Sequence, residues 1–156
     1  MRGPSITLPR HRSAKLFGVI LAAAALAACS TPAASPSSDG GGGTAVDVTL
    51  SEFKVEFNTT DIPAGDVTFN VTNDGTIVHE FVVFRTDVAE DALPEQSDEP
   101  EVNEDDPSLT SMGEVEDVEV GSTKSFSANL EAGDYVGICN VEGHYDSGMH
   151  IHFTVS

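Results

Sequence analysis

The sequence predicts an all-β domain, an antiparallel Greek-key β-sandwich of seven to eight strands over residues 45–156. Short runs in which apolar and polar residues alternate recur along this stretch, and clusters of Gly, Pro, Asn and Asp separate them. No window of comparable length keeps the 3.6-residue period of an amphipathic helix. Short strands at this density are typical of two sheets packed face to face.

The first three strands are expected at residues 45–50, 53–57 and 67–71. In each run apolar residues occupy every second position, which is the period of a strand with one buried face. A turn containing proline and glycine at residues 62–65 separates the second run from the third. The Asn-Asp-Gly sequence at 73–75 is a strong turn signal after the third run.

Four more strands complete the expected set. Residues 77–84 are almost continuously apolar, as in a central strand of a sheet. Residues 122–130 and 135–139 flank a tight Glu-Ala-Gly-Asp connection, and residues 150–155 form the last alternating run.

Residues 87–106 interrupt this pattern, because ten of the twenty are acidic and only three are aliphatic residues other than alanine. Asp87 and Glu90 can cap one helical turn before Pro94, but the rest carries too little apolar surface to become ordered. We therefore expect a solvated acidic loop between two strands. Calcium is an alternative for so acidic a run, although residues 98–106 lack the glycine and the ligand spacing of an EF-hand loop.

Residues 1–28 are expected to be a lipoprotein signal peptide. The thirteen apolar residues 16–28 are fewer than the roughly 20 that a bilayer span requires, and a basic segment precedes them. The run ends in Leu-Ala-Ala-Cys, which resembles a bacterial lipobox with Cys29 as the lipidated first residue; an ordinary cleavage site is the alternative. Residues 29–44, rich in Gly, Ser and Pro, are then a lipidated cysteine and flexible tether. The expected location is extracytoplasmic, anchored by lipid to the bacterial cell membrane.

The charge of the expected mature chain is strongly negative. Three basic residues (Lys54, Arg85 and Lys124) then stand against all 26 acidic residues, which gives a formal charge of −23. Nucleic acid is excluded as a partner, because this surface has nothing to neutralise phosphates. Cationic protein partners and a saline habitat are both compatible with the charge.

A second cysteine lies in a cluster of metal-ligand residue types near the C-terminus. Cys139, His144 and Met149 follow one another with C-x4-H-x4-M spacing, on an expected loop between two strands, and His79 lies 60 residues before Cys139. If Cys29 is lipidated, Cys139 has no cysteine left for an intramolecular disulfide. Two imidazoles, a thiolate and a weak thioether are the ligand set of a mononuclear blue-copper centre.

Each of these residues alone also has a structural interpretation. His79 in a strand can be a satisfied core histidine, Met149 can be core, and Cys139 can be a small buried hydrophobic residue. The occurrence of all four residues together favours a metal site, because the loop after Cys139 is expected to fold back over one end of the sandwich. His79, near the start of its strand and after a turn, is expected at that same end.

With these residues the chain resembles the cupredoxin (type 1 blue copper, plastocyanin/azurin-like) family over residues 45–156. The loop lengths are most similar to those of rusticyanin-type and sulfocyanin-type members. The resemblance implies that His79, Cys139 and His144 are equatorial copper ligands, that Met149 is the axial ligand, and that the Glu80 N–H bonds the sulfur. The chain departs from many members by carrying Glu80 where an Asn follows the first histidine, which removes a family brace between the ligand loops.

Two further histidines, His150 and His152, are expected on one face of the last strand, opposite Ile151 and Phe153. They form either a polar strand face or a second metal position, and His150 is an alternative axial ligand. A catalytic zinc site fits poorly, because no water-activating carboxylate accompanies the cluster. A binuclear copper centre is excluded, because it needs a second cysteine in the loop.

The expected function is one-electron transfer by a monomeric copper protein, which cycles between Cu(II) and Cu(I). Its expected partners are redox proteins, and cationic ones are compatible with its charge. The imidazole edge of His144 is the expected electron port, flanked by Gly143 and Tyr145. One alternative is a copper-delivery lipoprotein, in which the metal is the cargo. Another is a cupredoxin-like component of an uptake or oxidase system. The enzyme interpretation is disfavoured, because no second copper domain and no open coordination position are evident.

Overall fold

The computed structural model describes residues 43–59 and 61–156. The predicted signal peptide, Cys29 and almost all of the predicted tether lie outside the described residues. Within the described part of the chain no helix is present, and so none that is long and apolar enough to cross a membrane. Residues 43–59 and 61–156 form eight strands: β1 (Thr44–Ser51), β2 (Lys54–Phe57), β3 (Gly65–Asn73), β4 (His79–Arg85), β5 (Thr110–Val118), β6 (Thr123–Leu130), β7 (Gly133–Ile138) and β8 (His150–Val155).

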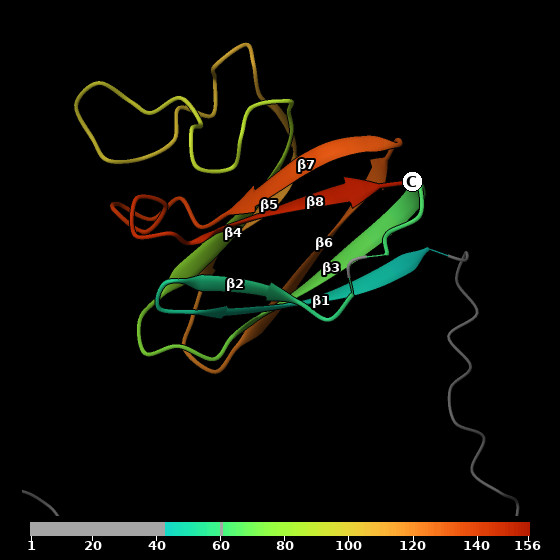
Figure 1. The fold of residues 1–156 in the computed structure, drawn as a ribbon. Helices are drawn as coiled ribbons and strands as arrows, with labels where there is room; N and C mark the ends of the chain where they lie inside the picture. The colour runs from blue at the N-terminus through green and yellow to red at the C-terminus, as the bar shows by residue number, and fades with distance from the viewer. Residues whose placement is uncertain (1–42, 60) are drawn as a thin grey trace, which may run out of the picture. The chain divides into compact units, whose positions relative to one another are not determined.

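The strands form two four-stranded sheets, which face one another as layers of a sandwich (Figure 1). One sheet has the order β2-β1-β3-β6 and the other the order β5-β4-β7-β8. The predicted all-β sandwich is confirmed. One pair, β1 with β3, is parallel, whereas every other pairing between the strands is antiparallel.

The main core lies between the sheets, because the alternating strands direct every second side chain inward. Phenylalanines dominate it: the ring of Phe69 contacts those of Phe57, Phe81, Phe126 and Phe153 at centroid distances of 5.1–6.1 Å. Each such side chain contributes roughly 1.5–3 kcal/mol by leaving water. Cys139 and Met149 belong to the same core, so the expected metal ligands lie at its edge.

Strand β5 was not among the predicted runs. Only Val115 and Val118 of its nine residues are buried, so the strand does not alternate. It lies at the edge of its sheet and pairs with β4 through two register shifts. Gly113 allows the ring of Phe126 to pack against this strand, since a Cβ there would lie 2.7 Å from the ring.

The acidic segment, residues 87–106, connects β4 to β5 and was expected to stay solvated. That expectation is wrong for its few apolar residues. Leu93 and Val102 are 4% and 0% exposed, and they belong to a second apolar cluster with side chains of β4 and β7. Backbone hydrogen bonds within the segment, such as Gln96 N–H to the Glu101 carbonyl, add local order. The segment therefore covers part of the β5-β4-β7-β8 sheet.

Candidate metal centre

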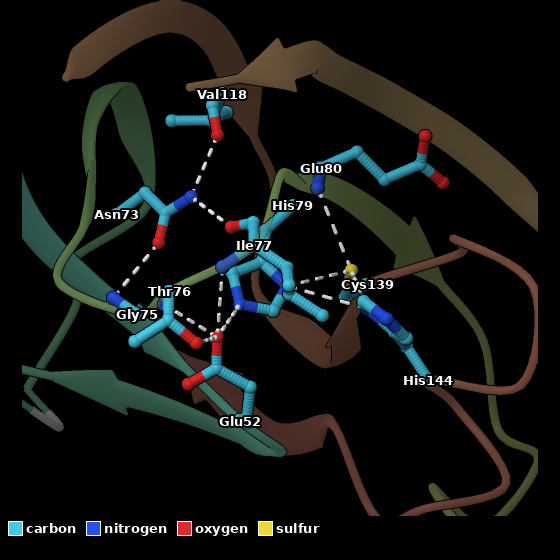
Figure 2. A network of polar contacts seen from close by, with 10 residues as sticks. All are labelled: Glu52, Asn73, Gly75, Thr76, Ile77, His79, Glu80, Val118, Cys139 and His144. Atoms are coloured by element: carbon cyan, nitrogen blue, oxygen red, sulfur yellow. Dashed lines mark hydrogen bonds and ion pairs between the residues drawn. The ribbon is translucent and has the colours of Figure 1, made fainter. Parts of the chain in front are cut away.

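Three of the predicted ligands meet at one end of the sandwich. His79 is the first residue of β4, Cys139 follows the last residue of β7, and His144 lies in the loop between β7 and β8. Their ligand atoms all lie within 4.8 Å of one another, and all three residues are buried. Figure 2 shows the two imidazoles and the thiol side by side, although 60 residues separate His79 from Cys139.

The same ring nitrogen of each histidine faces the cluster. Nδ1 of His79 lies 3.2 Å from Nδ1 of His144, and the Cys139 sulfur lies 3.8 Å and 3.3 Å from these two atoms. His79 and Cys139 are 0% exposed and His144 is 7% exposed, so water is largely excluded. Three donor atoms therefore converge in a dry space.

The protonation states of these groups are compatible with a bound cation. Burial lowers the pKa of His79, and burial together with the facing His79 lowers the pKa of His144. Both rings are therefore neutral at pH 7. Burial raises the pKa of the Cys139 thiol to about 11, against the opposing effect of the Glu80 and Val141 N–H groups. A metal that binds here displaces only the thiol proton. Imidazole with thiolate is the donor set that suits copper, so the residues present fit that ion.

Met149 lies in the same end of the core. It is 0% exposed, its N–H donates to the His144 carbonyl at 3.1 Å, and its carbonyl accepts from the Cys139 N–H at 3.0 Å. The backbone of Met149 is thus tied to both ligands of the loop. Its role as axial ligand stays a prediction.

The last two histidines have carboxylate neighbours. His150 Nδ1 lies 3.7 Å from Glu90, and His152 Nε2 lies 3.2 Å from Asp134. Phe153 on the opposite face packs in the core, as the alternation predicted. These contacts favour the polar strand face over a second metal position.

One predicted support is present, and a different asparagine holds the loop before His79. The Glu80 N–H donates to the Cys139 sulfur at 3.5 Å, as expected. Asn73 donates to the carbonyls of Ile77 and Val118, each at 2.7 Å, and accepts the Gly75 N–H (Figure 2). Asn73 therefore ties the loop before His79 to β5. The sequence marked this asparagine only as a turn residue.

The acidic segment is fastened to the ligand loop. The side chain of Asn140, next to Cys139, accepts from the Val102 N–H at 2.7 Å and donates to the Val102 carbonyl and to Glu104. The Tyr145 hydroxyl accepts from the Leu93 N–H at 2.8 Å. Tyr145 is 5% exposed and His144 is 7% exposed, and the role of the His144 edge as electron port stays a prediction. No sequence pattern pointed to these contacts.

The turn between β1 and β2 lies against both imidazoles. Glu52 Oε1 lies 3.6 Å from His79 Nε2, and the Phe53 ring lies edge-on to His144. Sequence reasoning missed both residues, because a Glu-Phe pair beside a turn carries no metal-site signal.

The surroundings of the site are acidic. Burial, reinforced by Glu104, Glu114 and Glu101, raises the pKa of Glu80 to about 7. Glu80 lines a hollow beside the cluster together with Glu101, Glu104 and Asn140. Acidic side chains therefore gather next to the ligand residues His79 and Cys139, in a hollow that the ligands themselves do not line.

Comparison with known proteins agrees with this geometry. A family model described as the sulfocyanin (SoxE) domain matches residues 51–156. No curated protein sequence matches the chain.

Three similar solved structures share the fold. A reduced auracyanin from Roseiflexus castenholzii has 18% identity and a TM-score of 0.54, and the match covers 72% of this chain and 97% of that protein. Auracyanin A from Chloroflexus aurantiacus, described as a blue copper protein, has 23% identity and a TM-score of 0.52, with 74% and 100% covered. Reduced rusticyanin has 22% identity and a TM-score of 0.54, with 75% and 81% covered.

Proposed function

This chain belongs to the sulfocyanin (SoxE) domain family, and from that membership we propose that it carries single electrons between redox partners at the outer face of a cytoplasmic membrane. It is a cupredoxin, and its cofactor is one copper ion. The observation that carries the proposal is the convergence of His79, Cys139 and His144 in a buried cluster.

The ligand assignment follows from which atoms face the cluster. His79 and His144 would bind through Nδ1 and Cys139 through its thiolate, while Met149, buried in the same core, would offer its thioether as a weak fourth ligand. When bound, copper supplies the one-electron Cu(II)/Cu(I) couple. The chain holds the donors in a packed core with hydrogen-bonded loops, so that they need to move little when the electron arrives.

The membrane location is proposed from the first 29 residues. A basic segment, a short apolar run and a Leu-Ala-Ala-Cys sequence support export and lipidation at Cys29. A lipid anchor would confine the carrier to the membrane surface, where it meets membrane-bound redox complexes. We propose that the carrier is a monomer, that its partners are cationic, and that it transforms no substrate.

The rival function is copper delivery, and two measurements on the copper-loaded protein separate it from the carrier. A carrier should show an intense blue or green thiolate-to-Cu(II) absorption band and reversible voltammetry with the metal retained. A delivery protein should instead lose Cu(I) rapidly to a competing chelator. Cys139→Ser should abolish the band and leave the β-rich circular dichroism intact. A colourless wild type that has bound Cu(II) would contradict the blue-copper assignment.

A further inference from the structure

The Glu52 carboxylate is held in a fixed position beside the metal centre. Its Oε1 accepts from the Thr76 N–H at 2.6 Å, the Ile77 N–H at 3.1 Å and the Thr76 hydroxyl at 3.3 Å (Figure 2). A carboxyl group that accepts three hydrogen bonds at one oxygen is ionised at neutral pH. In this side chain 28% of the surface is exposed.

The same carboxylate oxygen faces His79. It lies 3.6 Å from Nε2, and this buried nitrogen has no hydrogen-bond partner among the described residues. A neutral imidazole carries one N–H. A proton on Nε2 would point toward the carboxylate and leave the Nδ1 lone pair toward Cys139 and His144. The opposite tautomer would place a lone pair against an anion and a proton inside the ligand cluster. The geometry thus favours the proton on Nε2.

Gly75 keeps this contact open. A Cβ at Gly75 would lie 2.6 Å from Glu52 Oε1 and 3.0 Å from His79 Nε2. Both distances are shorter than a van der Waals contact, so a side chain there would push the two groups apart. A residue without a side chain therefore stands where the carboxylate and the imidazole approach one another.

We propose that Glu52 is a positioning residue of the metal centre. Its carboxylate fixes the ring of His79 with the proton on Nε2, and its negative charge stabilises the oxidised site relative to the reduced one. Carboxylates that accept the second N–H of a metal-bound imidazole act in this way in other metal sites. The proposal rests on the proposed copper function, but the tautomer can be measured without copper.

The first test uses the metal-free protein. Nitrogen-15 NMR of wild type should place the His79 proton on Nε2. Glu52→Gln keeps an oxygen for Thr76 and Ile77 and should keep this tautomer, whereas Glu52→Ala should give a mixture. A wild-type proton on Nδ1, or an unchanged tautomer in Glu52→Ala, would overturn the positioning role.

The second test uses the copper protein, with Asp74→Asn as a matched control that removes an exposed charge from the loop next to Gly75. Glu52→Gln should raise the reduction potential more than Asp74→Asn does. Glu52→Ala should lower Cu(II) affinity about 10- to 100-fold, and Glu52→Gln should restore most of it. Equal potentials in Glu52→Gln and Asp74→Asn would remove the charge effect. A wild type that binds no copper would end the proposed function and the charge effect together, and the tautomer result would still decide the positioning role.

Discussion

The ring of Phe53 lies edge-on against the imidazole of His144, with centroids 5.2 Å apart and planes inclined by 70°. Phe53 is 42% exposed, whereas His144 is 7% exposed. The exposed aromatic group at this ligand is therefore Phe53 from the β1–β2 turn, which shields the imidazole from solvent. The hydrophobic shell around a metal controls solvent access and so its potential.

Removing this shield should change the potential of the site. Phe53→Ala should admit water to His144 and lower the reduction potential, because water stabilises the more highly charged Cu(II) state. Phe53→Leu, which keeps an apolar cover, should change it less. Voltammetry of both variants checks this, and a wild-type potential in Phe53→Ala would show that Phe53 does not shield the site.

Met149 is expected to tune the potential more than it holds the metal. Met149→Gln replaces a thioether with a harder oxygen donor, so the reduction potential should fall while copper stays bound. Met112→Gln is a control on β5, where the methionine packs against the core without a place in the ligand loop. If Met149→Gln keeps the wild-type potential, Met149 is only a core residue, and His150 becomes the axial candidate to test.

Glu80 should make the stability of the metal-free protein depend on pH. Its pKa is raised from 4.5 to about 7, so the folded state binds the proton more tightly than the unfolded state does. The contribution of Glu80 to the unfolding free energy therefore falls as pH rises from about 4.5 to 7, and the full cost applies above pH 7.

Glu80→Gln should remove this cost. At pH 8 the variant should be more stable by on the order of 1–3 kcal/mol, after allowance for solvent screening of the partly exposed side chain. At pH 4 the difference should vanish, which makes each protein its own control. Urea unfolding across this range measures it, and a difference independent of pH would show that burial of Glu80 is not the cause.

Tyr145 should hold the acidic segment in place. Tyr145→Phe leaves the buried Leu93 N–H without its acceptor, which costs about 1–3 kcal/mol of unfolding free energy. Amide exchange should accelerate across residues 87–106. Tyr135→Phe is the matched control, because it also loses a hydroxyl hydrogen bond, here to the Glu131 carbonyl, but should leave exchange in that segment unchanged. Equal exchange in both variants would contradict the fastening role of Tyr145.

The acidic segment should also steer association with a cationic redox partner. The Debye length falls from about 30 Å at 0.01 M salt to about 3 Å at 1 M, so the electron-exchange rate should drop steeply as salt rises. Converting six carboxylates of this segment to amides should make the electron-exchange rate less dependent on salt. The six residues are Asp98, Glu99, Glu101, Glu104, Asp105 and Asp106. Amides keep the oxygens that bond Asn140 and Ser108.

A saline habitat is the competing explanation of the charge. It predicts that salt stabilises the fold and that the amide variant keeps the wild-type salt dependence of the rate. Thermal unfolding and exchange rates across one salt series separate the two explanations. A wild-type rate that ignores salt would remove the steering prediction.

Much of the fold was predictable, because apolar and polar residues alternate along most of its strands and this period of two can be seen in the sequence. Strand β5 was not, since at a sheet edge Glu114, Glu116 and Asp117 face outward and only two of its residues are buried. The order of the acidic segment was also missed. Leu93 and Val102 each pack into an apolar cluster that side chains of β4 and β7 form. The overall composition of an acidic segment does not reveal contacts made by two single residues.

The three buried ligands were predictable because few residue types bind copper, and because two of these ligands, Cys139 and His144, lie five residues apart. Glu52 was not, because an acidic residue 27 positions before His79 in a turn looks like any surface residue. Its relation to the imidazole exists only once β1, β2 and β4 are folded. Supporting residues of this kind can be recognised only from the tertiary structure, whereas the ligands can be recognised from their residue types.

The burial of the donor atoms has a consequence for how the protein acquires its metal. The Cys139 sulfur is 0% exposed and carries its proton at neutral pH, so it is protected from alkylation and oxidation before copper arrives. The same burial blocks entry of the ion. We therefore expect copper uptake to follow transient opening of the loop of residues 139–149, and the rate of colour development would then report how often that loop opens.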